Sequence, residues 1–286
     1  MGKKKRWESA YLNNAVYLNW YNLLKNIAVN RFKYDGIPET IDIRFLEMEL
    51  CETGWICYFK DDIIGDLVLP CTLASGFNVY GIPKRYDVYS NYNGYHAFRT
   101  IKNSVIIFNN YTHTPTEPII RDFARRFYEI DRAIDVNVKA QKTPIALLSS
   151  EKQRLTMKNL YMQYDGNEPF IFGDKDLLNL NDIKSINTNA PYVSDKMTIL
   201  KHQLLNEFLS IMGIENSNED KRERLVADEV GSNYGLVEMQ RNVALNARKQ
   251  AFEKINAMFN TNITVSFNTN LQTMINGYES VVHDNE

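Results

Sequence analysis

Two long segments that each carry a single apolar stripe constrain the fold of this chain most strongly. Apolar residues recur at helical spacing over 116–143 and again over 190–213, which predicts two long helices. The stripe of the first helix comprises Ile119, Phe123, Phe127, Ile130, Ile134 and Val138, and that of the second comprises Val193, Met197, Leu200, Leu204, Phe208 and Ile211.

The ends of both helices carry recognisable start and stop signals. Thr116 can cap the first helix, whose stripe stops before Thr143-Pro144. Asn189 is the expected cap of the second helix, with Pro191 in its first turn and Gly213 at its end. The two helices bracket 144–189, where we expect a small α/β insert with a strand near 145–148, a helix over 156–166 and the strand "PFIF".

The part of the chain before the first long helix is α plus β. A helix is predicted up to Val29, and a shorter one, "IRFLEMELCET", stops at Gly54. Four segments between Trp55 and Asn110 then have β-branched or aromatic character and are separated by Gly, Pro and Asn: "WICYFK", "IIGDLVLPCTL", "YDVYSNY" and "SVIIFNN". The fold class is therefore α+β.

After the second long helix comes the highly charged stretch "NEDKRERLVADEV", which has a net charge of −2 between Glu219 and Glu229. A third long helix is predicted over 235–259, followed by the strand "ITVSF" and a polar tail. The charged stretch is too mixed in sign to clamp nucleic acid and is more than a short connection.

Composition excludes several classes of protein. The chain has 286 residues, a net charge of −2 and a pI near 6.2, which argues against a surface built throughout for nucleic acid. No apolar run is long enough for a membrane span and no secretory signal follows the basic start, so we expect a soluble intracellular chain. Three cysteines and four scattered histidines lack metal-ligand spacing, so we expect buried reduced thiols and no metal.

No motif of a known catalytic site is present, and no cofactor is expected. A series of aromatic residues between 77 and 98, accompanied by Lys84, Arg85 and Arg99, allows two interpretations. Packing in half-buried strands is favoured. The alternative is a stacking platform for single-stranded nucleic acid. The series comprises Phe77, Tyr80, Tyr86, Tyr89, Tyr92, Tyr95 and Phe98.

Five long sequence segments, taken in their order along the chain, resemble segments of one protein family. They are "NVKAQKTPIALL", "LYMQYDGNEPFIF", "NAPYVSDK", "MGIENSNEDKRERLVADEVGSN" and "EKINAMFNTNITVSF". In these segments the chain resembles the portal proteins of small short-tailed phages of the Picovirinae type. Portal proteins are also called upper collar or head-tail connector proteins. The resemblance covers most of 38–267. It implies a non-enzymatic portal fold that assembles as a dodecameric ring around a channel for double-stranded DNA.

The resemblance also implies an assignment of the chain's parts. A basic N-terminal arm and wing correspond to 1–115, the stem helices to 116–143 and 190–213, and the clip to 144–189. The channel loop corresponds to 214–236, and the C-terminal wing or crown helix, strand and tail to 237–286. The implied partners are major capsid and scaffold proteins, a packaging ATPase, a packaging RNA, and lower collar or tail proteins. The implied location is the portal vertex of the virion, with host cytoplasm during assembly and no membrane.

Four sets of site residues follow from the resemblance. Lys196 matches a basic channel position of the stem, whereas the second such position is Asn187, where nearby Lys184 could substitute in part. The remaining sets are the loop residues Lys221, Arg222, Arg224, Asp228 and Glu229, the arm Lys3, Lys4, Lys5 and Arg6 for motor or packaging RNA, and Asp165, Gly166, Phe170 and Phe172 of the clip. A solvated loop and a solubilising tail remain the alternatives for the loop and the arm. For the whole chain, the alternatives are another collar or tail ring component, or a nucleic-acid-binding enzyme or module.

Overall fold

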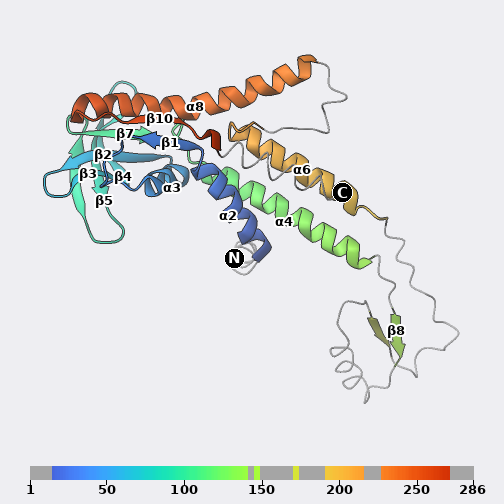
Figure 1. Cartoon of the computed structure of the whole chain (residues 1–286). Helices are drawn as coiled ribbons and strands as arrows, with labels where there is room; N and C mark the ends of the chain where they lie inside the picture. Colours follow the sequence, from blue (N-terminus) through green and yellow to red (C-terminus); the bar gives the residue numbers. More distant parts are fainter. Residues whose placement is uncertain (1–14, 141–144, 149–169, 174–190, 216–226, 271–286) are drawn as a thin grey trace. The chain divides into compact units, whose positions relative to one another are not determined.

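The computed structural model describes residues 15–140, 145–148, 170–173, 191–215 and 227–270. Figure 1 shows the helices and strands of the chain, coloured along the sequence. The chain divides into two compact units. Unit 1 comprises Met1–Arg125 and Leu204–Glu286, and unit 2 comprises Arg126–Gln203. No helix within the described ranges is both long and apolar enough to cross a membrane.

The first elements of unit 1 are helix α2 (Ala15–Val29), strand β1 (Phe32–Asp35) and helix α3 (Ile43–Thr53). The Asp42 side chain accepts the Phe45 N–H at the start of α3, and Gly54 ends the helix in the left-handed conformation, as its position predicted. The short strand β1 was not predicted, because it pairs with β10 (Thr264–Phe267) from the other end of the chain.

Unit 1 contains two three-stranded antiparallel sheets. Sheet B has the order β3-β2-β7 and sheet C the order β4-β5-β6. The predicted strand over 63–73 is divided at Pro70, and strand β6 was missed. The strands are β2 (Trp55–Asp61), β3 (Gly65–Leu69), β4 (Cys71–Phe77), β5 (Pro83–Tyr89), β6 (His96–Thr100) and β7 (Ser104–Phe108).

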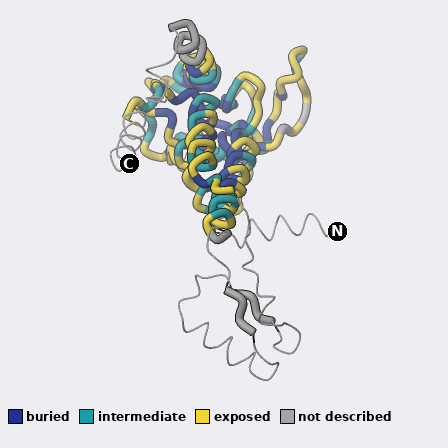
Figure 2. Tube along the Cα trace, turned by 90° about the vertical axis from the view of Figure 1, so that its right-hand side faces the viewer, coloured by how far each residue is buried: buried dark blue, intermediate teal, exposed yellow. Residues whose placement is uncertain are grey.

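Four consecutive residues of strand β2, Ile56 to Phe59, are buried, and Figure 2 draws such buried residues in dark blue. The alternating side chains of β2 enter two hydrophobic cores. Ile56 and Tyr58 join the core formed with α3, helix α8 (Ala227–Phe259) and the β1–β10 pair. Cys57 and Phe59 join a second core with Tyr86 and other residues of sheet C. The two cores hold sheet B between the helices and sheet C.

The long helices form as the stripes predicted, with corrections at their starts. Helix α4 spans Glu117–Ala140, and α6 spans Ser194–Ile211. Pro191 therefore precedes α6 rather than lying in its first turn. Helix α8 begins at Ala227, eight residues earlier than the predicted 235, so Asp228 and Glu229 belong to its first turn and not to a loop.

Each stripe is buried in part and exposed in part. Phe123, Phe127, Leu204 and Phe208 are buried, whereas Ile119, Val138 and Leu200 are exposed. In unit 2, the predicted strands of the insert are present as β8 (Ile145–Leu148) and β9 (Phe170–Gly173), which pair in parallel. The helix predicted over 156–166 lies outside the described residues.

Candidate functional site

The structure places only some of the predicted site residues, and it does not bring those together. Lys196 is exposed in the first turn of α6. Phe170 and Phe172 lie on β9, and Asp228 and Glu229 at the start of α8. The others lie outside the described residues: Lys3, Lys4, Lys5, Arg6, Asp165, Gly166, Lys184, Asn187, Lys221, Arg222 and Arg224.

Asn137 of α4 holds the N-terminal end of α6 within unit 2. Its Oδ1 accepts the Val193 N–H at 3.1 Å and the Ser194 hydroxyl at 3.0 Å, and its Nδ2 donates to the Pro191 carbonyl at 2.9 Å. A side chain from the neighbouring helix thus holds the start of α6. Asn189, the expected cap, lies outside the described residues. Asn137 was not predicted as a site residue.

Lys196 and Lys201 lie on the same helix in different electrostatic settings. Lys201 Nζ is 2.7 Å from Asp131 Oδ1, so its charge ties α6 to α4. Among the described residues, Lys196 forms no ion pair, and it shares its exposed side of α6 with Gln203. A cation in this setting remains available to an external anion such as a phosphate.

Large aliphatic side chains are exposed beside Lys196. Ile199 is 58% exposed and Leu200 45% exposed on α6, while Val136 and Val138 are exposed on α4. Burying such side chains stabilises an assembly by about 25 cal/mol per Å² of apolar surface. The helix pair therefore exposes apolar side chains that a protein partner can cover.

The other end of α6, in unit 1, is held by two arginines. Gly213 has φ +72° and, with Ile214, forms the 6→1 and 5→2 hydrogen bonds of a Schellman end. Arg31 Nη1 donates to the Met212 carbonyl at 3.2 Å, and Arg241 Nε donates to the Gly213 carbonyl at 2.9 Å. These bonds fix the position of the chain at the end of α6.

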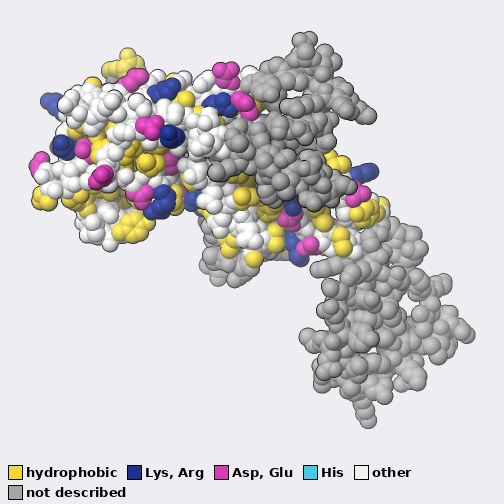
Figure 3. All heavy atoms as spheres, viewed as in Figure 1, with side chains coloured by type: hydrophobic (Ala, Val, Ile, Leu, Met, Phe, Trp, Pro, Cys, Tyr) yellow, Lys and Arg dark blue, Asp and Glu magenta, His cyan; other side chains and the backbone are white. Residues whose placement is uncertain are grey.

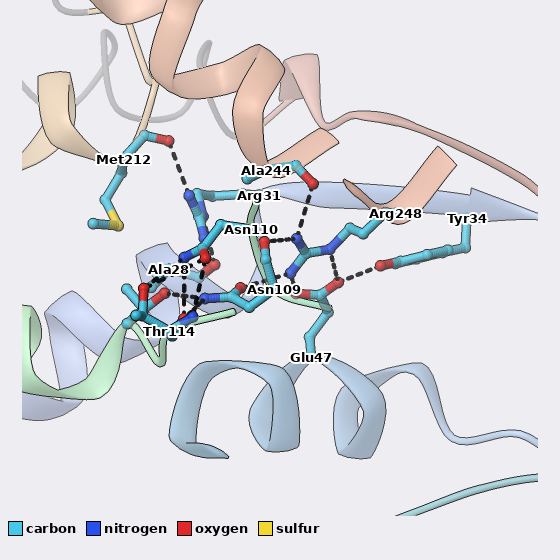
Figure 4. A network of polar contacts seen from close by, with 11 residues as sticks. Ala28, Arg31, Tyr34, Glu47, Asn109, Asn110, Thr114, Met212, Ala244 and Arg248 are labelled. Atoms are coloured by element: carbon cyan, nitrogen blue, oxygen red, sulfur yellow. Dashed lines mark hydrogen bonds and ion pairs between the residues drawn. The ribbon is translucent and has the colours of Figure 1, made fainter. Parts of the chain in front are cut away.

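Arg31 also borders a buried polar network around Arg248 (Figure 4). All five N–H donors of Arg248 are satisfied by Glu47, by Asn109 and by the Ala244 carbonyl. Burial acts to lower the pKa of Arg248, but Glu47 and Tyr34 together outweigh burial and raise the pKa above its ordinary value. Burial, and secondarily Glu47, raise the pKa of Tyr34, whose hydroxyl donates to Glu47. This network is structural.

Burial and the neighbouring Arg248 lower the pKa of Arg31 to about 10, which is still high enough to keep Arg31 charged at neutral pH. The three cysteines are buried, as expected. Burial raises the pKa of Cys51 to about 12, and a hydrogen bond with Cys57, followed by burial, raises that of Cys71. Such thiols stay protonated and are poor nucleophiles.

The aromatic series of sheet C divides between the two interpretations. Tyr86 is buried, and Tyr95 is half-buried with its hydroxyl 2.6 Å from Asp61 Oδ2, in agreement with packing. Four other members are exposed: Phe77, Tyr80, Tyr92 and Phe98. Tyr89 is intermediate. Packing thus accounts for part of the series only.

Comparisons with known proteins identify the family. The family described as Phage Connector (GP10) matches residues 2–272. Three solved structures are similar over most of their length at low sequence identity. The portal and tail of native bacteriophage P68 is 14% identical, with 94% of this chain and 91% of that chain covered and a TM-score of 0.49.

The second structure is an HK97 family phage portal protein from Corynebacterium diphtheriae. It is 12% identical, with 90% of this chain and 93% of that chain covered and a TM-score of 0.42. The third is the neck of an empty GTA particle computed with C6 symmetry. It is 11% identical, with 91% of this chain and 82% of that chain covered and a TM-score of 0.41. The family match, which spans nearly the whole chain, carries the assignment. This chain belongs to the phage connector family and is a phage portal protein, a head-tail connector.

Proposed function

We propose that twelve copies of this chain form a closed ring at one vertex of the capsid, around a channel through which double-stranded DNA enters during packaging and leaves at ejection. The observation that carries the channel assignment is Lys196, an exposed lysine without an ion pair among the described residues. It lies on a helix that the family resemblance assigns to the stem.

The exposed aliphatic side chains of unit 2 support assembly of the stem. Ile199 and Leu200 of α6, with Val136 and Val138 of α4, would be covered by the helices of the adjacent subunit. Lys196 flanks this apolar surface, so it can face a lumen while its aliphatic neighbours pack. At the second channel position, which is basic in the family, this chain has Asn187, and the nearby Lys184 would substitute for the missing charge in part.

A sparse ring of cations suits a channel that must let DNA slide. Each phosphate that is neutralised adds counter-ion release to the affinity, and a closed ring multiplies each contact by the number of subunits. One lysine per subunit touches passing phosphates without holding them. The anions Asp228 and Glu229, in the first turn of α8, would offset the cations Lys221, Arg222 and Arg224 of the proposed loop.

The other parts of the chain would serve docking. The clip, with Asp165, Gly166, Phe170 and Phe172, would meet the packaging ATPase and later the lower collar and tail proteins. The basic arm, Lys3 to Arg6, would bind the motor or a packaging RNA at low salt. The wing and crown would contact major capsid and scaffold proteins, first in the host cytoplasm and then in the virion.

Native mass spectrometry of the purified chain, with end-on electron micrographs, tests the ring. Discrete assemblies near twelve subunits with a central hole are expected, whereas a monomer or dimer at micromolar concentration in several salts would contradict the proposal.

Lys196→Ala tests the channel. It should leave the ring intact and change channel conductance or DNA retention. Lys249→Ala is the matched control, because it removes an exposed lysine of α8. Wild-type conductance and retention in the Lys196 variant would exclude a lumenal lysine.

A further inference from the structure

The two ends of sheet C present surfaces of different character. One end, here called the basic end, consists of the β4–β5 hairpin tip and the β6–β7 turn. It carries five exposed apolar side chains, of which Val79 is 92% and Tyr80 84% exposed. Its charged residues are Lys84, Arg85 and Lys102, all exposed, and none of them forms an ion pair within the described ranges. The other apolar members are Phe77, Ile82 and Ile101.

The tip of the basic end is held in one conformation by its own hydrogen bonds. Asn78 Oδ1 accepts the N–H groups of Tyr80 and Ile82, both at 2.9 Å. The Asn78 N–H donates to the Ile82 carbonyl at 2.9 Å, which closes the loop. Because the turn is already ordered, little conformational entropy is lost when Val79 and Tyr80 bind a partner.

The opposite end of sheet C meets the β2–β3 turn, here called the acidic end. Ile63 is 95% exposed, Ile64 and Tyr92 are also exposed, and Asp62 adds an exposed carboxylate. Asp61 orders this turn by accepting the N–H groups of Ile63 and Ile64 at 3.0 and 3.2 Å. The acidic end is thus a second apolar projection, with a charge of the opposite sign.

The neighbouring charges do not cancel that of Asp62. Lys60 lies opposite Asp66 in the β2–β3 register, and Arg99 lies 3.6 Å from Asp61. The three carboxylates of this region, Asp61, Asp62 and Asp66, outnumber these two cations. Hydrophobic side chains also stand out along the outline of unit 1 in Figure 3, among charged ones of both signs. The acidic end therefore retains the charge of Asp62.

The register of the strands separates the two ends. The β5–β6 connection, which includes Tyr95, follows the last residue of β5, Tyr89, and Tyr95 is bonded to Asp61 of the acidic end. The hairpin tip precedes the first residue of β5, Pro83. Seven residues of β-strand extend about 20 Å. The two ends cannot meet within one subunit.

We propose that the basic end of one subunit docks against the acidic end of the next copy of this chain. The inference rests on the proposed ring and names one of its subunit contacts. Two different surfaces that pair head to tail generate a closed ring when the rotation closes. Opposite charges set the orientation of the contact, and the apolar residues of both ends, with Tyr80 at the centre, supply the buried surface.

Site-specific cross-linking of purified rings tests the contact. Val79→Cys and Ile63→Cys are placed in separate, differently tagged chains that are co-expressed, and the rings are treated with a short bismaleimide. The native cysteines are buried, so the introduced thiols are the ones expected to react. Co-expressed chains should give a covalent dimer that carries both tags, neither variant alone should give one, and the double variant in one chain should give a ladder of oligomers.

Charge reversal supplies an independent measurement. Lys84→Glu with Arg85→Glu should lower the ring fraction by about tenfold at equal subunit concentration, and Asp62→Lys in the same chain should restore it. Lys249→Glu is the control for added negative charge. Rings that form without mixed cross-links, or that cross-link through Val79→Cys alone, would overturn the contact and leave the tip to another protein. Failure of the unmodified chain to form rings would instead count against the ring itself.

Discussion

Arg248 and Glu47 form a bidentate ion pair in the core of unit 1, with the Nε–Oε1 and Nη2–Oε2 distances both 2.8 Å. Their side chains are 0% and 3% exposed. The pair connects α8 with α3 through two residues that lie 201 positions apart in the sequence. Since Arg31 is also buried nearby, Glu47 is the carboxylate that offsets the charge in this region.

Glu47→Gln should destabilise the subunit by about 3–5 kcal/mol, because it leaves a buried guanidinium without its counter-ion. Urea unfolding at a fixed subunit concentration measures the change. Asp35→Asn is the control: its carboxylate is 3.4 Å from Lys33 on the surface, and its loss should cost less than about 1 kcal/mol. A double variant, Glu47→Leu with Arg248→Met, should be less damaging than Glu47→Gln alone. Equal urea midpoints for Glu47→Gln and Asp35→Asn would show that the Arg248–Glu47 ion pair does not contribute to the stability of the subunit.

Gly213 and Gly81 both have φ +72° but differ in their surroundings, which separates two costs of substitution. An added Cβ at Gly213 would lie 2.5 Å from the Arg241 N, whereas at Gly81 no described atom lies within 4 Å. Gly81→Ala should lower the free energy of unfolding by about 1–2 kcal/mol, the cost of placing an alanine in the left-handed conformation. Gly213→Ala should cost about 1–3 kcal/mol more, since the end of α6 must move away from α8. Equal shifts in the thermal midpoint of the two variants would contradict the close approach.

Elements with local signals were predictable from the sequence. Helix α3 and its Gly54 end, the cores of α4 and α6, and strands β2 and β7 all lie where periodicity and turn residues placed them. Strands β1 and β6 were missed, since β1 has only four residues and its partner lies near the other end of the chain, and β6 exposes His96 and Phe98. Helix α8 continues through Gly231 and Gly235, residues that disfavour helix by about 1 kcal/mol each, so its start was placed too late.

The site was less predictable than the fold, because its contacts join distant parts of the chain. Asn137 lies 56 residues from the Val193 amide that it binds, and nothing in its local sequence marks it as a cap for another helix. The Arg248–Glu47 pair did leave a signal. Each residue interrupts an apolar stripe with a full charge, of opposite sign, and two such interruptions predict a buried partner for each other. Lys196 was found through the family resemblance.

Asn137→Ala should loosen the start of α6 without unfolding unit 1. The variant loses the hydrogen bonds to Val193, Ser194 and Pro191, and capping interactions of this kind contribute about 1–2 kcal/mol. Hydrogen exchange at the Val193 amide should accelerate about tenfold, while amides of α3 keep their protection. Thr198→Val is the control on the same helix, because within the described part of the chain the Thr198 hydroxyl binds the Ser194 carbonyl of its own turn and no other group. Unchanged exchange at Val193 in the Asn137 variant would mean that the helix start is held by other contacts.

Asp61 should make the stability of the subunit depend on pH in the acid range. The Tyr95 hydroxyl, the N–H groups of Ile63 and Ile64, and Arg99 together hold the pKa of Asp61 below its ordinary value of 3.8. A carboxylate with a lowered folded-state pKa contributes stability above its unfolded pKa and loses it as the pH falls through the folded value.

The difference in urea midpoint between the natural chain and Asp61→Asn should therefore be constant near neutral pH and shrink below about pH 4. Asp62→Asn, which removes the adjacent exposed carboxylate, serves as the control and should not reproduce this change. If the Asp61 difference persisted unchanged at the lowest pH at which the chain still folds, the contribution would come from the shape of the turn and not from its charge. The acidic end would then be held chiefly by backbone geometry, and its orientation toward a neighbouring subunit would survive acidification.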